Sequence, residues 1–227
     1  MTSTEPRQQH RADVIVYGAG GHVGRAVVAE GRRRGLTVTA AVRDPELHAD
    51  LAADGVTLVR CDVTDPAAVA ATAPGHPAAV ASVYTPDTPS EEFYRAATTA
   101  LISGLGRAGV PRLLGVGVAT TLQTAPGIAV HDDPAFPEAH RTFSLGHTAA
   151  LDLLHASPAT LDWVVVTPPT DLDRTSPGTG HYRVGSAPRP RPPDRPGRPR
   201  RRRVNPCTNR PRRASWAPWP RTSQPSR

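Results

Sequence analysis

A glycine-rich turn joins an apolar run to a helical pattern near the start of this chain. The run Val14–Tyr17 leads into "GAGGHVGRAVVAEGRRRG", where glycines stand at positions 18, 20, 21 and 24. In a nucleotide site, Gly18 permits a sharp exit from the strand, Gly21 lets a pyrophosphate approach the backbone, and Gly24 lets the helix lie close. The first N–H groups of the helix would face the phosphates. A turn without a ligand is the alternative, but the strand–turn–helix context favours a dinucleotide cradle. Its expected members are Gly18, Gly20, Gly21, His22, Val23 and Gly24.

The first 170 residues alternate short apolar runs with longer helical patterns. Near-continuous apolar strands between helices are typical of a parallel sheet that is covered on both faces. We therefore predict an α/β fold, a Rossmann-like doubly wound parallel sheet in a three-layer αβα arrangement. The expected strands are residues 13–17, 37–42, 56–60, 78–83, 112–118 and 161–167. The expected helices are residues 22–34, 46–53, 66–73, 90–108 and 138–156, and Pro66 suits the first turn of its helix.

The distribution of charge divides the chain into two parts. Residues 187–227 contain 13 arginines, 11 prolines and one acidic residue, a net charge of +12. The preceding residues contain 14 arginines and 19 acidic residues, a net charge of −5. Proline ends helices and arginines repel one another, so we predict a disordered tail. The predicted organisation is a disordered N-terminus (1–11), a Rossmann-like NAD(P)-binding domain (12–186) and the tail (187–227).

The tail has two interpretations. Its composition changes abruptly near Ser186, as out-of-frame reading of a GC-rich gene would cause. A basic arm for nucleic acid or an acidic membrane surface is the alternative, although any segment of this charge binds polyanions non-specifically at low salt. The candidate contacts of such an arm are Arg201, Arg202, Arg203, Trp216 and Trp219.

The end of the second expected strand bears on the choice of cofactor. NAD-binding folds usually place Asp or Glu there to accept from the ribose 2′-OH, whereas this chain has Arg43. A guanidinium suits the 2′-phosphate of NADP(H), so NADP(H) is favoured over NAD(H). Asp44 follows directly and could still reach a ribose, and Arg43 could be only a solvated loop charge.

Two further strand ends are expected to meet the cofactor. Asp62 would contact the edge of the adenine ring and Val63 its face, although Asp62 could instead cap the next helix. Ser82, Val83 and Tyr84 would lie beside the central part of the dinucleotide, since such sheets bind ligands at the carboxyl ends of their strands.

These segments together resemble a known family. The stretches "VIVYGAGGHVGRAVVAEGRRRGLTVTAAVRDP", "GVTLVRCDVTDPAAVA", "AGVPRLLGVGVATTL" and "LDWVVVTPPTDL" are similar to the atypical short-chain dehydrogenases of the NAD(P)H-binding, NmrA-like group. The branch with the greatest similarity is that of the NADH-flavin reductases and biliverdin reductase B-like proteins, which "TLQTAPGIAVHDDPAFPEAHR" also resembles. The resemblance covers about residues 12–186. It implies NAD(P)H binding and reduction of FMN, FAD or a similar conjugated acceptor.

The sequence departs from the wider superfamily at the catalytic positions. The chain contains no lysine, so the Tyr-x-x-x-Lys pair of carbonyl-reducing members cannot exist here. Hydride transfer to a flavin needs less acid assistance, because the protein mainly positions the reactants. The resemblance implies that a Ser and a His flank the nicotinamide in the related reductases. Thr121 and Thr170 stand at the matching positions, and only Thr121 is a candidate catalytic residue.

The remaining chemistry-bearing residues predict no further site. His131, His140, His147 and His155 are interpreted as solvated histidines, since no carboxylate or Cys completes a metal site. The two cysteines, Cys61 in the domain and Cys207 in the tail, argue against a disulfide framework. They favour a reducing, cytoplasmic setting. No apolar run approaches the ~18 residues of a membrane span, and the N-terminus lacks the apolar core of a signal peptide.

The sequence therefore predicts an NAD(P)H-dependent reductase with a small-molecule acceptor. A non-catalytic NADP(H)-sensing regulator of the NmrA-like kind is the first alternative, and nucleic-acid binding through the tail is the second. Consumption of NADPH with FMN or FAD separates the first two functions.

Overall fold

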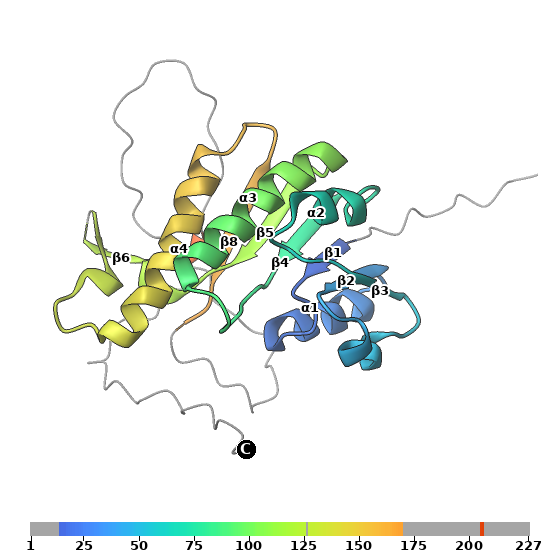
Figure 1. Cartoon of the computed structure of the whole chain (residues 1–227), viewed down its shortest axis with the longest axis horizontal. Coiled ribbons are helices and arrows are strands. Elements are labelled where there is room, and N and C mark those ends of the chain that lie inside the picture. Colours follow the sequence, from blue (N-terminus) through green and yellow to red (C-terminus); the bar gives the residue numbers. More distant parts are fainter. Residues whose placement is uncertain (1–13, 126, 170–204, 207–227) are drawn as a thin grey trace, which may run out of the picture.

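The computed structural model describes residues 14–125, 127–169 and 205–206, and a parallel sheet forms its centre (Figure 1). The strands of this sheet are β1 (Val14–Tyr17), β2 (Val38–Val42), β3 (Val56–Arg60), β4 (Ala78–Ala81), β5 (Arg112–Val116), β8 (Asp162–Thr167) and β9 (Asn205–Pro206). Their spatial order is β3-β2-β1-β4-β5-β8-β9, and every neighbouring pair is parallel. The strand order reverses between β1 and β4, as in a doubly wound sheet, which confirms the predicted Rossmann-like α/β fold.

Helices cover both faces of the sheet. They are α1 (His22–Arg33), the 3-10 helix η1 (Glu46–Leu51), α2 (Pro66–Thr72), α3 (Ser90–Ala108) and α4 (Glu138–Ala156). Successive strand residues point to opposite faces, so Ile15 and Val16 belong to different cores. Ile15 packs in the larger core with residues of α2, α3 and α4. Val16 packs in the smaller core with Val28 of α1 and Leu51 of η1. This division produces the predicted three-layer αβα arrangement.

The start of α2 shows how local sequence fixes an element. Asp65 is its N-cap, and the carboxylate Oδ1 accepts from the backbone N–H of Ala67 at 2.8 Å. Pro66 occupies the first helical position, where a missing N–H costs nothing. The alternative that Asp62 caps this helix is wrong, because its carboxylate accepts from the N–H and hydroxyl of Thr64 instead.

Replacing Asp65 with alanine is expected to lower the free energy of unfolding by about 1 kcal/mol, the usual contribution of an N-cap side chain. Urea denaturation of the full chain measures this loss. The matched control is Asp152→Ala, which removes an exposed aspartate from the C-terminal half of α4. Equal stability of the two variants would contradict the capping role of Asp65.

Four features differ from the sequence-based prediction. Residues 46–53 were expected to form a helix, whereas the 3-10 helix η1 ends at Leu51 and contains a non-helical His48 with φ −129° and ψ 24°. Strands β4 and β5 end two residues early. A small antiparallel hairpin, β6 (Gln123–Ala125) with β7 (Ile128–Ala129), follows β5 and the 3-10 helix η2 (Ala119–Thr121). It projects beside α4 (Figure 1).

The fourth difference concerns the tail. Asn205 and Pro206 form β9 and pair with Val166 and Thr167 of β8, so predicted disorder is wrong for these two residues. A proline is compatible with this position because β9 is an edge strand, where one side makes no ladder bonds. The other residues of the predicted tail, the N-terminus 1–13 and Thr170 lie outside the described residues.

Candidate functional site

The glycine turn lies at the carboxyl ends of β1 and β4, where the strand order reverses. Gly18 has a left-handed φ of +75°, and a Cβ added there would overlap the carbonyl group of Ser82. The N–H of Ser82 donates to the carbonyl of Tyr17 at 3.0 Å, which ties the segment after β4 to the end of β1. Only glycine allows both the backbone conformation and the close approach. The turn therefore lies at the point of strand reversal, where doubly wound sheets bind ligands.

The first turn of α1 fits a phosphate group. No side chain caps its N-terminus and no acidic residue occupies its first turn, so the opening N–H groups keep their partial positive charge. A Cβ on Gly24 would lie 2.8 Å from Ala19 Cα, so glycine is needed for the helix to approach the turn. At Gly21, by contrast, the nearest atom to an added Cβ would be Gly18 O at 3.4 Å, an ordinary contact. Gly21 is exposed, and packing within the protein does not require a glycine there.

A group of side chains supports the turn from outside, and sequence reasoning missed it. A Cβ on Gly20 would overlap the imidazole of His48, which reaches the turn because η1 is irregular at that residue. Arg25 Nε donates to Gly20 O at 3.0 Å, and the same guanidinium pairs with Asp50. Arg25 Nη2 also lies 3.3 Å from His48 Nδ1. These residues come from α1 and η1, and only the fold brings them together.

Arg43 follows β2 at the same edge of the sheet. It is exposed, and its guanidinium makes no ion pair or hydrogen bond within the part of the chain that the structure describes. Asp44 is engaged instead, because its Oδ1 accepts from the N–H of Glu46 at 3.2 Å and lies 3.5 Å from Arg60 Nη2. Between the two candidates for the ribose, Arg43 is thus the one whose functional group is free to bind a ligand.

The residues expected to contact the adenine ring differ in accessibility. Asp62 is exposed after β3, and its Oδ1 accepts both hydrogen bonds from Thr64, so Oδ2 makes no hydrogen bond within the described residues. Val63 is only 7% exposed and belongs to the larger core. It therefore offers a ring little surface.

The segment after β4 carries an exposed aromatic ring. Val83 packs against Gly18, and its carbonyl accepts from the phenol of Tyr94 on α3 at 3.1 Å. The ring of Tyr84 is 63% exposed and meets Phe143 of α4 edge-on, with 5.8 Å between the ring centroids. An exposed aromatic ring thus stands beyond the carboxyl end of β4, in contact with α4.

The hydroxyls of η2 differ in their hydrogen bonds. Thr121 Oγ1 donates to Val118 O at 2.9 Å, which closes the turn. Thr120 Oγ1 accepts from the buried Ser144 Oγ of α4 at 2.8 Å. The sequence singled out Thr121, and nothing in the pattern marked Thr120. Ser144, the partner of Thr120, lies 24 residues away and is brought close only by the packing of α4 against η2.

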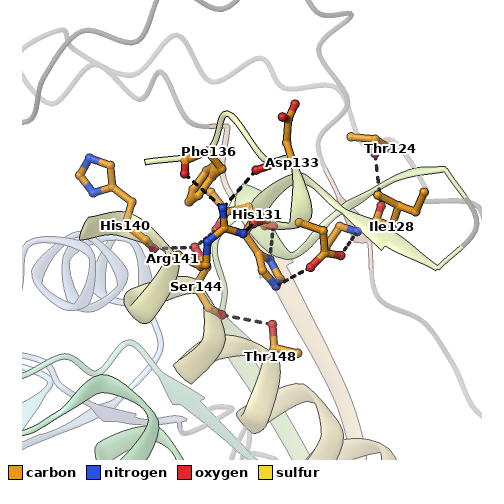
Figure 2. A network of polar contacts seen from close by, with 12 residues as sticks. Thr124, Ile128, His131, Asp133, Phe136, His140, Arg141, Ser144 and Thr148 are labelled. Carbon is orange, nitrogen blue, oxygen red and sulfur yellow. Dashed lines mark hydrogen bonds and ion pairs between the residues drawn. The ribbon is translucent and has the colours of Figure 1, made fainter. Parts of the chain in front are cut away.

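A polar network holds the loop between η2 and α4 (Figure 2). The guanidinium of Arg141 donates to the carbonyls of His131, Asp133 and Phe136, and it also pairs with Glu138. His131 is 4% exposed, and its Nδ1 lies 2.8 Å from Thr120 O. The prediction that His131 is solvated is therefore wrong, because the loop folds back onto η2.

His147 is also buried, which corrects the same prediction. It is 7% exposed, its ring lies 4.0 Å from the ring of Tyr94 and 4.9 Å from that of Phe143, and its Nε2 has no hydrogen-bond partner. Burial lowers the pKa of His147 to about 4, so the imidazole is neutral near pH 7. Burial also raises the pKa of Tyr94 above its usual value, so this phenol is a poor acid.

Metal-binding clusters and membrane-spanning helices are both absent from the described residues. Among them, no cluster of three or more His, Cys, Asp and Glu side chains could hold a metal ion. Within the same residues, every helix is too short or too polar to cross a membrane.

Comparisons with known proteins agree with the geometry of the glycine turn. Residues 18–197 match the model of the NAD(P)H-binding family. None of the curated proteins matches this chain.

Several solved structures are similar to the chain over most of its length. A putative exported protein from Burkholderia pseudomallei is 32% identical, with a TM-score of 0.65, and the match covers 78% of this chain and 80% of that one. A putative epimerase from Bacteroides thetaiotaomicron is 29% identical, with a TM-score of 0.67, and coverage of 78% and 79%. A putative NADH-flavin reductase from Streptococcus pneumoniae is 25% identical, with a TM-score of 0.64, and coverage of 78% and 80%.

The uncapped helix N-terminus, the close glycine packing and the family match all point to the same nucleotide. A nicotinamide dinucleotide fits the residues present. The cytoplasmic setting stays a prediction, because the Burkholderia relative is named a putative exported protein. The chain belongs to the NAD(P)H-binding family of Rossmann-fold proteins.

Proposed function

We propose that this chain is an NADPH-dependent oxidoreductase that reduces a flavin, FMN or FAD, or a similar conjugated small molecule. The observation that carries the proposal is the uncapped α1 N-terminus together with Arg43 at the carboxyl edge of the sheet, whose guanidinium has no partner among the described residues. The dinucleotide would supply a hydride from its nicotinamide ring. The residues of the chain would bind it, orient it and keep water from the reacting atoms.

The cradle from Gly18 to Gly24 would hold the pyrophosphate. Gly21 leaves room over the backbone, and the N–H groups of His22, Val23 and Gly24 open the helix toward an anion. Asp62 would accept from the adenine edge through its exposed oxygen. Ser82 and Val83 would border the middle of the dinucleotide, since they pack against Gly18 at the start of the cradle.

Arg43 supports NADPH over NADH. Arg25 and Arg60, the other arginines near this edge, are paired with Asp50 and Asp44, whereas the guanidinium of Arg43 is unpaired within the described residues. A 2′-phosphate would give Arg43 a charge-assisted partner, and NADH has none to offer.

Replacing Arg43 with alanine is expected to raise the Kd for NADPH about tenfold and to leave the Kd for NADH unchanged. Fluorescence titration with each nucleotide measures both values. Arg107→Ala is the matched control, because it removes one exposed arginine from the last turn of α3. Parallel loss of NADPH and NADH affinity in Arg43→Ala would contradict recognition of the 2′-phosphate.

A flavin-type acceptor is supported by three observations. The Streptococcus relative is named a putative NADH-flavin reductase. The chain has no lysine and therefore lacks the acid–base pair of carbonyl-reducing relatives. The exposed ring of Tyr84 offers a planar molecule a stacking surface beside the nicotinamide position.

Anaerobic mixing of the purified chain with NADPH and FMN or FAD tests the proposed function. Loss of NADPH absorbance together with bleaching of the flavin supports the reductase. Tight NADPH binding without turnover of any conjugated acceptor would favour the alternative, an NADP(H)-sensing regulator, for which the missing Tyr–Lys pair is the supporting observation.

A further inference from the structure

Thr120 and Ser144 form a pair of hydroxyls with a third oxygen behind them. Ser144 is 1% exposed on the inner side of α4. Its Oγ lies 2.8 Å from Thr120 Oγ1 and 2.9 Å from the carbonyl oxygen of His140. A serine hydroxyl has a single proton, so Ser144 can donate to only one of these two oxygens at a time. The pair therefore has two arrangements of nearly equal geometry.

Thr120 lies beyond the carboxyl end of β5, at the edge of the sheet where the proposed acceptor would bind. Helix η2 begins three residues after β5 ends. Because β4 and β5 are parallel neighbours, η2 and the segment after β4 lie at the same edge of the sheet. Thr120 is half-buried, so part of it reaches solvent. Its carbonyl accepts from His131, and Arg141 holds the loop that follows (Figure 2). Its backbone is thus held in place while its hydroxyl can still turn.

We propose that Thr120 and Ser144 act as a reversible hydroxyl relay that hydrogen-bonds the acceptor atom receiving the hydride, before and after reduction. In the first arrangement Ser144 donates to Thr120, and Thr120 donates to the acceptor. In the second, Thr120 accepts from the acceptor and donates to Ser144, which donates to His140 O. Each hydroxyl only rotates, and no O–H bond breaks.

This relay rests on the proposed function, and it matches the chemistry of that acceptor class. The nitrogen of an oxidised flavin that takes up hydride carries a lone pair and accepts a hydrogen bond. After reduction the same nitrogen carries a hydrogen and donates one. A group with fixed polarity could satisfy only one of these states, whereas Thr120 can satisfy both. Thr121 cannot do so while its hydroxyl proton is donated to Val118 O.

The test compares Thr120→Val with Thr99→Val, which changes an exposed threonine of α3. Each change replaces a hydroxyl by a methyl of similar size. We expect Thr120→Val to lower kcat/KM for FMN by about tenfold, the effect of one ordinary hydrogen bond, and Thr99→Val to leave it unchanged. Thr120→Ser should restore most of the loss. The Kd for NADPH should stay at the wild-type value in all three variants.

A binding measurement gives a readout that does not depend on turnover. With NADP⁺ bound, Thr120→Val should weaken the binding of both oxidised FMN and anaerobically reduced FMN, each measured by fluorescence or absorbance titration. Weakening of one form alone would overturn the reversible relay. Wild-type values for Thr120→Val in kcat/KM would overturn the role of Thr120. Failure of the wild-type chain to reduce or bind any flavin would overturn the proposed function and the relay together.

Discussion

Replacing Gly21 with alanine is expected to raise the Kd for NADPH by about 100-fold or more and to leave the fold intact. A Cβ at this position meets nothing closer than Gly18 O at 3.4 Å, and the residue has an ordinary φ of −74°. The protein alone therefore tolerates alanine. The pyrophosphate does not, because the methyl group would occupy the space over the backbone, and overpacking of this kind costs up to ~3 kcal/mol. Nucleotide titration and thermal unfolding of the free protein measure the two effects separately.

Two further glycine variants are compared with Gly21→Ala. Gly106→Ala is the matched control, since an added Cβ there lies in open space on α3, away from the cradle. It should bind NADPH as the wild type does. Gly18→Ala should instead destabilise the free protein, because its Cβ would overlap Ser82 and its φ is left-handed. If Gly21→Ala retained full affinity for NADPH, the glycine segment would be only a turn.

His147 is expected to make the protein sensitive to acid. Burial lowers the pKa of His147 to about 4, whereas an exposed histidine in the unfolded chain has a pKa near 6.5. Between these values the unfolded chain binds more protons than the folded one, so acid favours unfolding. The free energy of unfolding therefore has its full value above pH 6.5 and decreases as the pH falls toward 4. The shift corresponds to a loss of ~3 kcal/mol in the free energy of unfolding.

The variant His147→Leu tests this expectation, because leucine has a similar size and does not titrate. Urea denaturation at several pH values gives the difference in stability between variant and wild type, in which the titration of other groups cancels. The difference should grow in favour of the variant between pH 6.5 and 4. The control His155→Gln removes an exposed histidine of the same helix and should retain the wild-type loss. A constant difference over this range would show that His147 is not buried as a neutral imidazole.

The sequence was sufficient for the fold because its signals are local. The run Val14–Tyr17 and the glycines after it define a strand, a turn and a helix within 20 residues. Pro66 and the patterns of α3 and α4 place their helices within a residue of the predicted bounds. Irregular segments such as η1 and the β6–β7 hairpin were missed, because neither has a period of its own and both are shaped by what they pack against.

The residues of the candidate site also fall into those that the sequence reveals and those that depend on packing. Gly18, Gly21, Gly24 and Arg43 are visible in the sequence, because each acts through its own backbone or through its place after a strand. The engagement of Asp44 by Arg60, the burial of His147 and the contact of Thr120 with Ser144 join residues that are distant along the chain. Sequence by itself determined the sheet and the glycine turn at the end of its first strand, since hydrophobic period and glycine spacing are local properties. Only the tertiary structure decided which charges are paired, which histidines are buried and which hydroxyls hydrogen-bond each other, because burial and pairing depend on packing between distant elements.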